Sequence, residues 1–122
     1  MHELPFVMGL LEESERTARE EGLTQLTRIC VEVGELSGIE PDCVRLYFET
    51  ASEGTVAENA ELEILKRPAM LQCVQCRLEF EHDVRAASGE GRNPFICPHC
   101  GGDGVLMKGT GTGARLLQVE GR

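Results

Sequence analysis

The chain has 122 residues, which is enough for one compact domain with a small satellite and too few for a multidomain enzyme. It carries 12 Lys and Arg against 21 Asp and Glu, and the formal net charge of −9 disfavours nonspecific binding to nucleic acid or to an anionic membrane surface. The sequence has neither an apolar run of about 18 residues nor the basic and apolar start of a secretory signal. We therefore expect a cytoplasmic protein that does not span a membrane and whose thiols stay reduced.

The N-terminal half predicts two helices and two strands. Apolar residues at helical spacing predict a first helix over residues 5–21. Strict alternation over residues 25–33 predicts a half-buried strand. A second apolar stripe begins after Pro41 and predicts a helix that ends before Gly54. Residues 61–67 predict a second strand, which a proline then ends.

The sequence changes character at residues 69–109, where helical periodicity disappears and four of the six cysteines lie. Residues 114–120 read as a strand again. We therefore predict an α+β fold with a small mixed sheet of about three strands and two helices, built from residues 1–68 and 110–122. Residues 69–109 are predicted to form an inserted zinc-ribbon-like domain.

The inserted segment contains two CxxC pairs, Cys73 with Cys76 and Cys97 with Cys100, separated by 20 residues. Each pair can form a tight turn that aims two sulfur atoms at one point, and two such turns supply the tetrahedron of thiolates that Zn(II) prefers. Four protein ligands leave no open position, so we predict a structural Zn(II) site. Two disulfides or a redox dithiol are the alternatives, and neither explains why both pairs occur in so small a segment.

The remaining cysteines and histidines carry weaker signals. Cys30 falls on the first predicted strand and Cys43 at the start of the second helix, and both are expected to be buried free thiols. His82 lies on the spacer between the cysteine pairs, which we expect to be flexible. His99 lies inside the second CxxC turn, where a histidine is usually exposed beside the metal ligands. Neither histidine is assigned as a ligand.

The first residues of the chain offer a second metal site. The α-amine of Met1, the backbone nitrogen of His2 and its imidazole can close two chelate rings on one ion, and the Glu3 backbone nitrogen or another ligand can complete a plane. Nitrogen-rich square-planar coordination selects Ni(II) or Cu(II), with Cu(II) bound more tightly. An exposed site with few anchors suits transfer of a metal better than its storage.

Several sequence segments together resemble the HypA/HybF family of nickel metallochaperones. They are Met-His-Glu-Leu at residues 1–4, Val-Gly-Glu-Leu-Ser-Gly at residues 33–38, the two CxxC turns, and Leu-Leu-Gln-Val-Glu at residues 116–120. The resemblance covers essentially the whole chain. One departure concerns the position after the first CxxC pair, where the family commonly has glycine and this chain has Arg77.

The resemblance implies a nickel-binding domain interrupted by a structural zinc domain, in a protein that is a monomer or a homodimer. Met1, His2 and Glu3 would hold Ni(II) as cargo, and the four cysteines would hold Zn(II). The protein would deliver nickel to the large-subunit precursor of a [NiFe] hydrogenase together with a HypB-type GTPase. In some members of the family the client is urease, reached through urease maturation proteins.

Two other classes of function fit the sequence less well. A zinc-ribbon protein-interaction or nucleic-acid-binding module would show basic charge and exposed aromatic residues. Residues 69–109 instead carry five acidic and four basic residues and contain neither Trp nor Tyr. An enzyme would show a nucleophile–base motif or a phosphate loop, but the glycine-rich residues 109–113 lack the lysine of such a loop. We therefore predict that the protein is not an enzyme.

Overall fold

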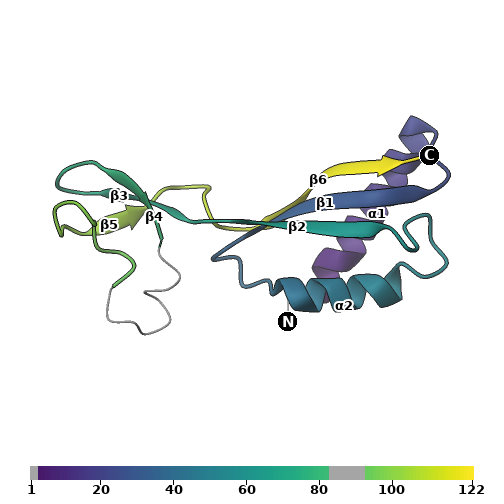
Figure 1. Ribbon diagram of the computed structural model, residues 1–122, viewed down its shortest axis with the longest axis horizontal. Coiled ribbons are helices and arrows are strands. Elements are labelled where there is room, and N and C mark those ends of the chain that lie inside the picture. The colour runs from purple at the N-terminus through teal and green to yellow at the C-terminus, as the bar shows by residue number, and fades with distance from the viewer. Residues whose placement is uncertain (1–2, 83–92) are drawn as a thin grey trace.

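The computed structural model describes residues 3–82 and 93–122. These residues form two lobes arranged end to end, each built around a three-stranded sheet (Figure 1). The elements in chain order are α1 (Glu3–Glu21), β1 (Leu26–Gly34), α2 (Pro41–Ala51), β2 (Glu61–Arg67), β3 (Met70–Cys73), β4 (Glu79–Glu81), β5 (Gly104–Leu106) and β6 (Ala114–Gly121). We call α1, β1, α2, β2 and β6 the helical lobe, and β3, β4 and β5 with their turns the cysteine lobe.

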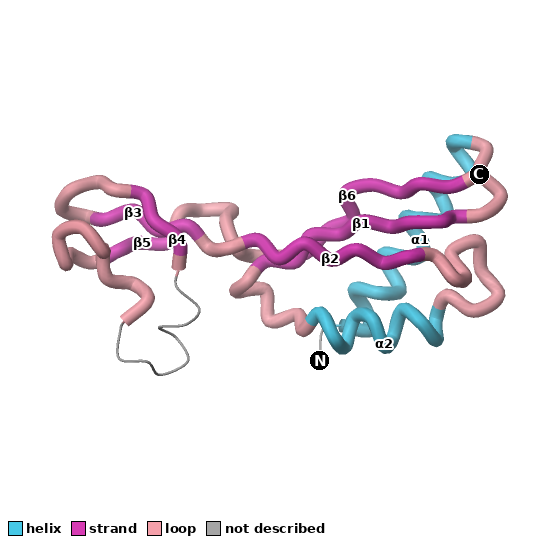
Figure 2. Tube along the Cα trace, viewed as in Figure 1, coloured by secondary structure: helices cyan, strands magenta, loops and turns pink. Residues whose placement is uncertain are grey.

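The sheet of the helical lobe has the strand order β2-β1-β6 and is mixed, as predicted. Strand β1 pairs in parallel with β2, where Ile29 stands opposite Leu62, and antiparallel with β6, where Ile29 stands opposite Val119. Both helices lie on the same face of this sheet (Figures 1 and 2). The C-terminal strand therefore returns to the N-terminal half of the chain and closes the lobe.

The core of the helical lobe lies between the helices and the sheet. Strand β1 buries alternate side chains, as its sequence predicts, and Ile29 and Val31 are fully buried. Helix α1 begins at Glu3, two residues before the predicted start. Pro5 is tolerated inside the first turn because the N–H groups of that turn have no intrahelical acceptor. Neither helix among the described residues is long and apolar enough to span a bilayer.

The other face of this sheet carries charge instead of a second layer. Arginine and glutamate side chains pair across its three strands in two clusters, Glu63–Arg28–Glu120 and Arg67–Glu32–Arg115. Cys30 lies on β1 between residues of the two clusters and is half-buried, so the expectation of a buried thiol was wrong. Cys43 is likewise half-buried. The face of the sheet opposite the helices stays in contact with solvent, which explains both the two charged clusters and the partial exposure of Cys30.

The cysteine lobe has the strand order β4-β3-β5, with both pairings antiparallel. Its buried cluster is small and contains Leu71, Phe80 and two of the cysteines. The sequence did not predict these three strands, because runs of three or four residues are too short for an alternating pattern to be recognised. A core of this size cannot hold the lobe together without a cross-link or a metal.

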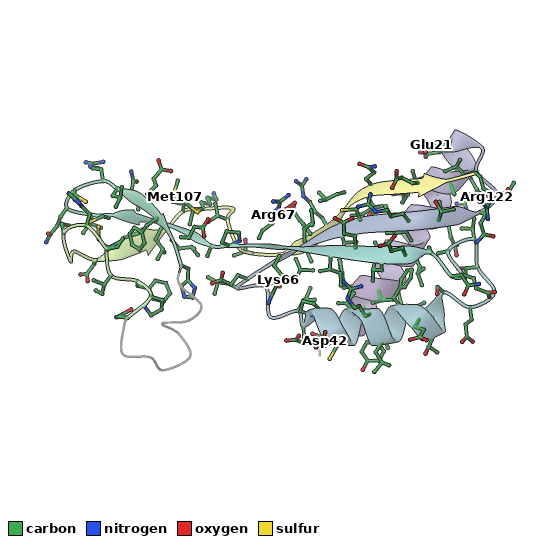
Figure 3. All side chains as sticks on the ribbon, in the orientation of Figure 1. Glu21, Asp42, Lys66, Arg67, Met107 and Arg122 are labelled. Carbon is green, nitrogen blue, oxygen red and sulfur yellow. The ribbon has the colours of Figure 1, made fainter. Side chains whose placement is uncertain are left out.

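Two chain segments cross between the lobes side by side. One joins β2 to β3, and the other joins β5 to β6; Arg67 and Met107 mark the two crossings in Figure 3. The crossings are in close contact, because a Cβ atom placed on Gly111 would lie 2.5 Å from the Cα of Ala69. The Met70 N–H also donates to Thr110 Oγ1 at 3.0 Å. The junction is thus packed rather than an open linker.

Candidate metal centre

The first CxxC turn begins at the end of β3. The Cys73 N–H donates to the Leu78 carbonyl at 2.9 Å, and the Arg77 N–H donates back to the Cys73 carbonyl at 3.1 Å, which closes the turn. Within it, the N–H groups of Gln75 and Cys76 point at Cys73 Sγ, at 3.4 and 3.5 Å. The turn therefore presents N–H dipoles to a sulfur atom, an arrangement that stabilises a thiolate.

The second CxxC turn repeats this plan. The Gly101 N–H donates to the Cys97 carbonyl at 3.0 Å, and the Cys97 N–H donates to the Gly102 carbonyl at 2.8 Å. The N–H of His99 points at Cys97 Sγ at 3.4 Å. Both turns are therefore hydrogen-bonded in the same way. In each turn the first cysteine is buried and the second is exposed.

The residue that follows each turn has a left-handed backbone. Gly101 has φ 77°, which glycine adopts without a steric penalty. Arg77 occupies the equivalent place with φ 68°, so the arginine adopts the conformation that glycine supplies in the second turn. The departure from the family pattern leaves the turn geometry intact and places a side chain with a strained backbone next to the cluster.

The four cysteine sulfur atoms converge on one point. All four Sγ atoms lie within 4.8 Å of one another. Cys73 Sγ is 3.4 Å from Cys100 Sγ, and Cys76 Sγ is 3.6 Å from Cys97 Sγ. These separations exceed the about 2.05 Å of a disulfide. They approach the edge of about 3.8 Å in a tetrahedron with metal–sulfur bonds of about 2.3 Å. The donor set and its shape therefore fit a tetrahedral, thiophilic metal ion.

The local electrostatics lower the pKa of two of the four thiols, which favours binding of a cation. The N–H groups of Cys76 and Gln75 lower the pKa of the Cys73 thiol to about 6. Burial raises the pKa of Cys97, but the N–H groups of Cys100 and His99 outweigh burial and leave this pKa below its usual value. One thiol of each turn therefore ionises more readily than an ordinary cysteine thiol. A bound metal ion would displace the remaining protons.

The pKa of Cys76 shifts the other way. The Leu78 N–H lowers it, but burial and the sulfur atoms of Cys100, Cys97 and Cys73 together outweigh that hydrogen bond and raise the pKa. Four like charges within one cluster repel each other, so without a metal the thiols cannot all ionise. The cluster therefore favours a divalent ion, which neutralises half of the charge of four thiolates.

Of the three residues predicted to hold nickel, Met1 and His2 lie outside the described residues. Glu3 is the first residue of α1, and it is only 7% exposed. Its Oε2 accepts the N–H of Glu40 at 3.2 Å. Glu40 is the N-cap residue of α2, and its own side chain forms no capping hydrogen bond. The Glu3 carboxylate therefore links the starts of the two helices. Its negative charge interacts favourably with the positive ends of their dipoles.

The two histidines of the cysteine lobe have different environments. His99 is exposed, as predicted for a histidine in a CxxC turn. His82 is 8% exposed, and its Nδ1 contacts Glu35 Oε1. The expectation that His82 sits on a flexible spacer was therefore wrong: it follows β4 directly and is packed at the junction between the lobes. Sequence reasoning also missed two glutamates in the loop after β1: Glu35, which contacts His82, and Glu40, whose N–H donates to Glu3.

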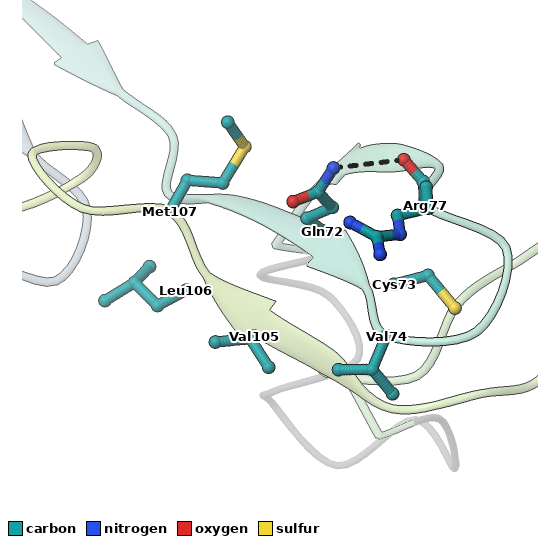
Figure 4. Close-up of a pocket in the computed structure, with 7 residues that line it drawn as sticks. All are labelled: Gln72, Cys73, Val74, Arg77, Val105, Leu106 and Met107. Atoms are coloured by element: carbon teal, nitrogen blue, oxygen red, sulfur yellow. Dashed lines mark hydrogen bonds between the residues drawn. The ribbon is translucent and has the colours of Figure 1, made fainter.

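A shallow groove of about 320 Å³ lies beside the four cysteines, on the surface of β3 and β5 (Figure 4). The residues that line it are Gln72, Cys73, Val74, Arg77, Val105, Leu106 and Met107. In Figure 4 the side chains of Gln72 and Arg77 lie at one end of the groove and those of Val74 and Val105 at the other. These lining residues include no carboxylate and no imidazole.

Comparison with known proteins identifies similar chains along the full length. Residues 1–120 match the family described as HypA, hydrogenase/urease nickel incorporation, metallochaperone. The hydrogenase maturation factor HypA of Caldanaerobacter subterraneus subsp. tengcongensis is 38% identical over 120 residues, which cover 98% of both chains. The hydrogenase maturation factor HybF of Salmonella typhimurium is 33% identical over 123 residues, again covering 98% of both chains.

Solved structures show the same architecture. The solution structure of the Ni metallochaperone HypA from Helicobacter pylori is similar with a TM-score of 0.62 and 25% identity, over 99% of this chain and 97% of that one. A second solution structure of a HypA protein has a TM-score of 0.66 and 25% identity, over 100% of this chain and 97% of that one. The overall arrangement of helices and sheets is therefore shared with solved structures.

Proposed function

The chain belongs to the HypA family of metallochaperones for hydrogenase and urease nickel incorporation, and from this premise we propose that it binds one Ni(II) ion at its own N-terminus. The cargo is then delivered to the large-subunit precursor of a [NiFe] hydrogenase. The single observation that carries the proposal is the Met-His-Glu sequence at the start of the chain, whose third residue, Glu3, is the first residue of α1.

The chemistry of the ligands supports a nickel site there. The amine of Met1, the backbone and imidazole nitrogens of His2, and a fourth donor would surround Ni(II) in a plane. The Glu3 backbone nitrogen or another ligand would supply the fourth donor, while the Glu3 carboxylate accepts the Glu40 N–H. The same carboxylate provides negative charge at the start of a helix, which offsets the repulsion between a helix dipole and a cation.

The four-cysteine cluster is proposed to hold Zn(II) as a structural ion. Cys73, Cys76, Cys97 and Cys100 would bind it through four thiolates, which leave no position for a substrate or a water molecule. When bound, zinc would cross-link the two turns of a lobe whose own core is small. We propose on the same grounds that residues 69–109 form a separate domain inserted into residues 1–68 and 110–122.

The partners follow from the family. We propose transfer of nickel together with a HypB-type GTPase in the cytoplasm, without catalytic turnover by this chain. Urease, reached through urease maturation proteins, is a second class of client, because the family description names it. A zinc-ribbon module that binds nucleic acid is not favoured, since the whole chain carries a net charge of −9.

Nickel titration of zinc-loaded protein with a native, unblocked N-terminus tests the N-terminal chelate. We expect a 1:1 nickel complex that is lost in His2→Ala and in a version extended at the N-terminus, because the first removes the imidazole and the second removes the α-amine. His99→Ala is the matched control, since it removes an exposed imidazole outside the proposed chelate. Equal nickel binding by all the forms, or loss of binding in the control alone, would refute the proposal.

A further inference from the structure

We propose that Glu35 and His82 form a buried latch that fixes the orientation of the cysteine lobe relative to the helical lobe. The two residues come from different lobes and are 47 positions apart in the chain. His82 Nδ1 contacts Glu35 Oε1, and the two side chains are only 6% and 14% exposed. Burying polar groups costs free energy unless they are paired, so each of these side chains depends on the other.

His82 is fixed within the cysteine lobe. It follows β4 directly, and its N–H donates to the Ala69 carbonyl at 2.8 Å. Its ring packs edge-on against the ring of Phe95, with 5.0 Å between the centroids and an interplanar angle of 66°. The imidazole therefore has a defined position and direction in that lobe before any contact with the other lobe is considered.

Glu35 is fixed within the helical lobe. It follows β1 directly, and its N–H donates to the Arg67 carbonyl at the end of β2, at 2.8 Å. The next N–H, that of Leu36, donates to the Gly111 carbonyl at 2.7 Å. The backbone that carries the carboxylate is thus held by the last residues of the sheet and by the returning chain segment.

The two crossings run side by side and pack against each other. A twist of one lobe against the other about this shared connection is therefore the motion that a contact between the lobes would oppose. Figure 1 shows that the loop after β1 reaches towards the cysteine lobe beside the crossings, on the side where β4 ends. A side-chain contact at this place, between Glu35 and His82, opposes the twist.

A histidine can serve this role in either protonation state. Neutral imidazole with its proton on Nδ1 donates one hydrogen bond to a carboxylate, and imidazolium adds an attraction between opposite charges. Loss of either partner leaves the other polar group buried and unpaired, and a twist that exposes this group to water then becomes favourable.

Residual dipolar couplings of backbone N–H groups test the proposal in zinc-loaded, nickel-free full-length protein. One alignment tensor should fit both lobes of the unaltered chain. In Glu35→Leu and in His82→Leu the common tensor should be lost, and the double variant should lose it to the same extent, because both changes remove one contact. Glu35→Gln keeps an oxygen acceptor for Nδ1–H and should retain the common tensor.

The control is Glu81→Leu, which replaces an exposed carboxylate on β4 next to His82 and should leave one tensor. If His82→Leu loses zinc or fails to fold, Glu35→Leu decides the matter, because Glu35 lies in the other lobe. Two tensors in the unaltered chain, or one tensor in Glu35→Leu, would overturn the proposal. Since nickel is absent throughout, either result leaves the N-terminal chelate to be judged separately.

Discussion

At the scale of single residues, the two turns of the metal centre use different means to reach the same geometry. Gly101 and Arg77 both adopt a left-handed backbone after the second cysteine of their turns, with φ 77° and 68°. In each turn the N–H of this residue donates to the carbonyl of the first cysteine. The hydrogen bond compensates for a conformation that a side chain makes unfavourable by about 1–2 kcal/mol.

Replacement of Arg77 by glycine should therefore stabilise the cysteine lobe. We expect a gain of about 0.5–1 kcal/mol in the free energy of unfolding, because relief of the strained backbone exceeds the entropy that glycine adds to the unfolded chain. Chemical denaturation of the zinc-loaded protein, followed by signals from the cysteine lobe, measures it. Gly101→Ala is the matched control and should lower the stability; a loss of stability in Arg77→Gly would contradict this explanation.

Nickel affinity should depend on pH through the same atoms that are proposed to bind it. An α-amine and an imidazole have ordinary pKa values of about 7.7–8.0 and about 6.5, and both must lose their protons to bind a metal. Since protons compete with nickel, affinity should fall at least about tenfold per pH unit below neutrality. Titrations at a series of pH values measure this slope. A flat profile would exclude this set of ligands.

At the scale of elements, the edge strand β2 and the end of strand β1 each make a tertiary contact that the sequence pattern does not reveal. Strand β2 lies at the edge of its sheet, and Arg45 on α2 donates to the Leu62 carbonyl at 2.6 Å. This contact ties the edge strand to a helix that covers one face of the sheet. At the end of β1, Gly34 lies against the returning segment, where a Cβ atom would be 2.5 Å from the carbonyl carbon of Gly111.

A methyl group should have opposite effects at two glycines of the helical lobe. Gly34→Ala should lower the free energy of unfolding by about 1–3 kcal/mol, because the methyl group meets backbone that cannot move aside cheaply. Gly9→Ala should raise it by about 0.5–1 kcal/mol, since Gly9 lies inside α1 with no atom within 4 Å of the added Cβ. Urea denaturation followed by circular dichroism compares them, and equal changes in both variants would show that the junction is not tightly packed.

At the scale of the whole molecule, the two lobes have different sources of stability. The helical lobe has a continuous core of two helices and a sheet, in which Val7, Ile29, Val31 and Val44 are fully buried. The cysteine lobe has a buried cluster in which two of the four residues are themselves cysteines, Cys73 and Cys97. Its stability therefore depends on whatever joins the sulfur atoms.

Removal of the metal should destabilise the cysteine lobe much more than the helical lobe. When a chelator takes zinc from the protein, we expect the backbone amides of β3, β4 and β5 to lose their protection from hydrogen exchange, while those of α1 and β1 keep most of theirs. Exchange measured by NMR distinguishes the lobes residue by residue, and added zinc should restore the protection. Unchanged protection in the cysteine lobe after complete removal of zinc, or equal loss in both lobes, would contradict this division.

The sequence alone was sufficient for the features that local pattern controls. The period of apolar residues gave both helices and the three strands of the helical lobe, and the spacing of the CxxC pairs predicted the convergence of four sulfur atoms, because neighbours along the chain decide both. Only the tertiary structure decided the rest. The Glu3 carboxylate at the start of α1 accepts the Glu40 N–H, and the buried His82 contacts Glu35 from the other lobe. These contacts join groups far apart in the chain, and no local pattern records them.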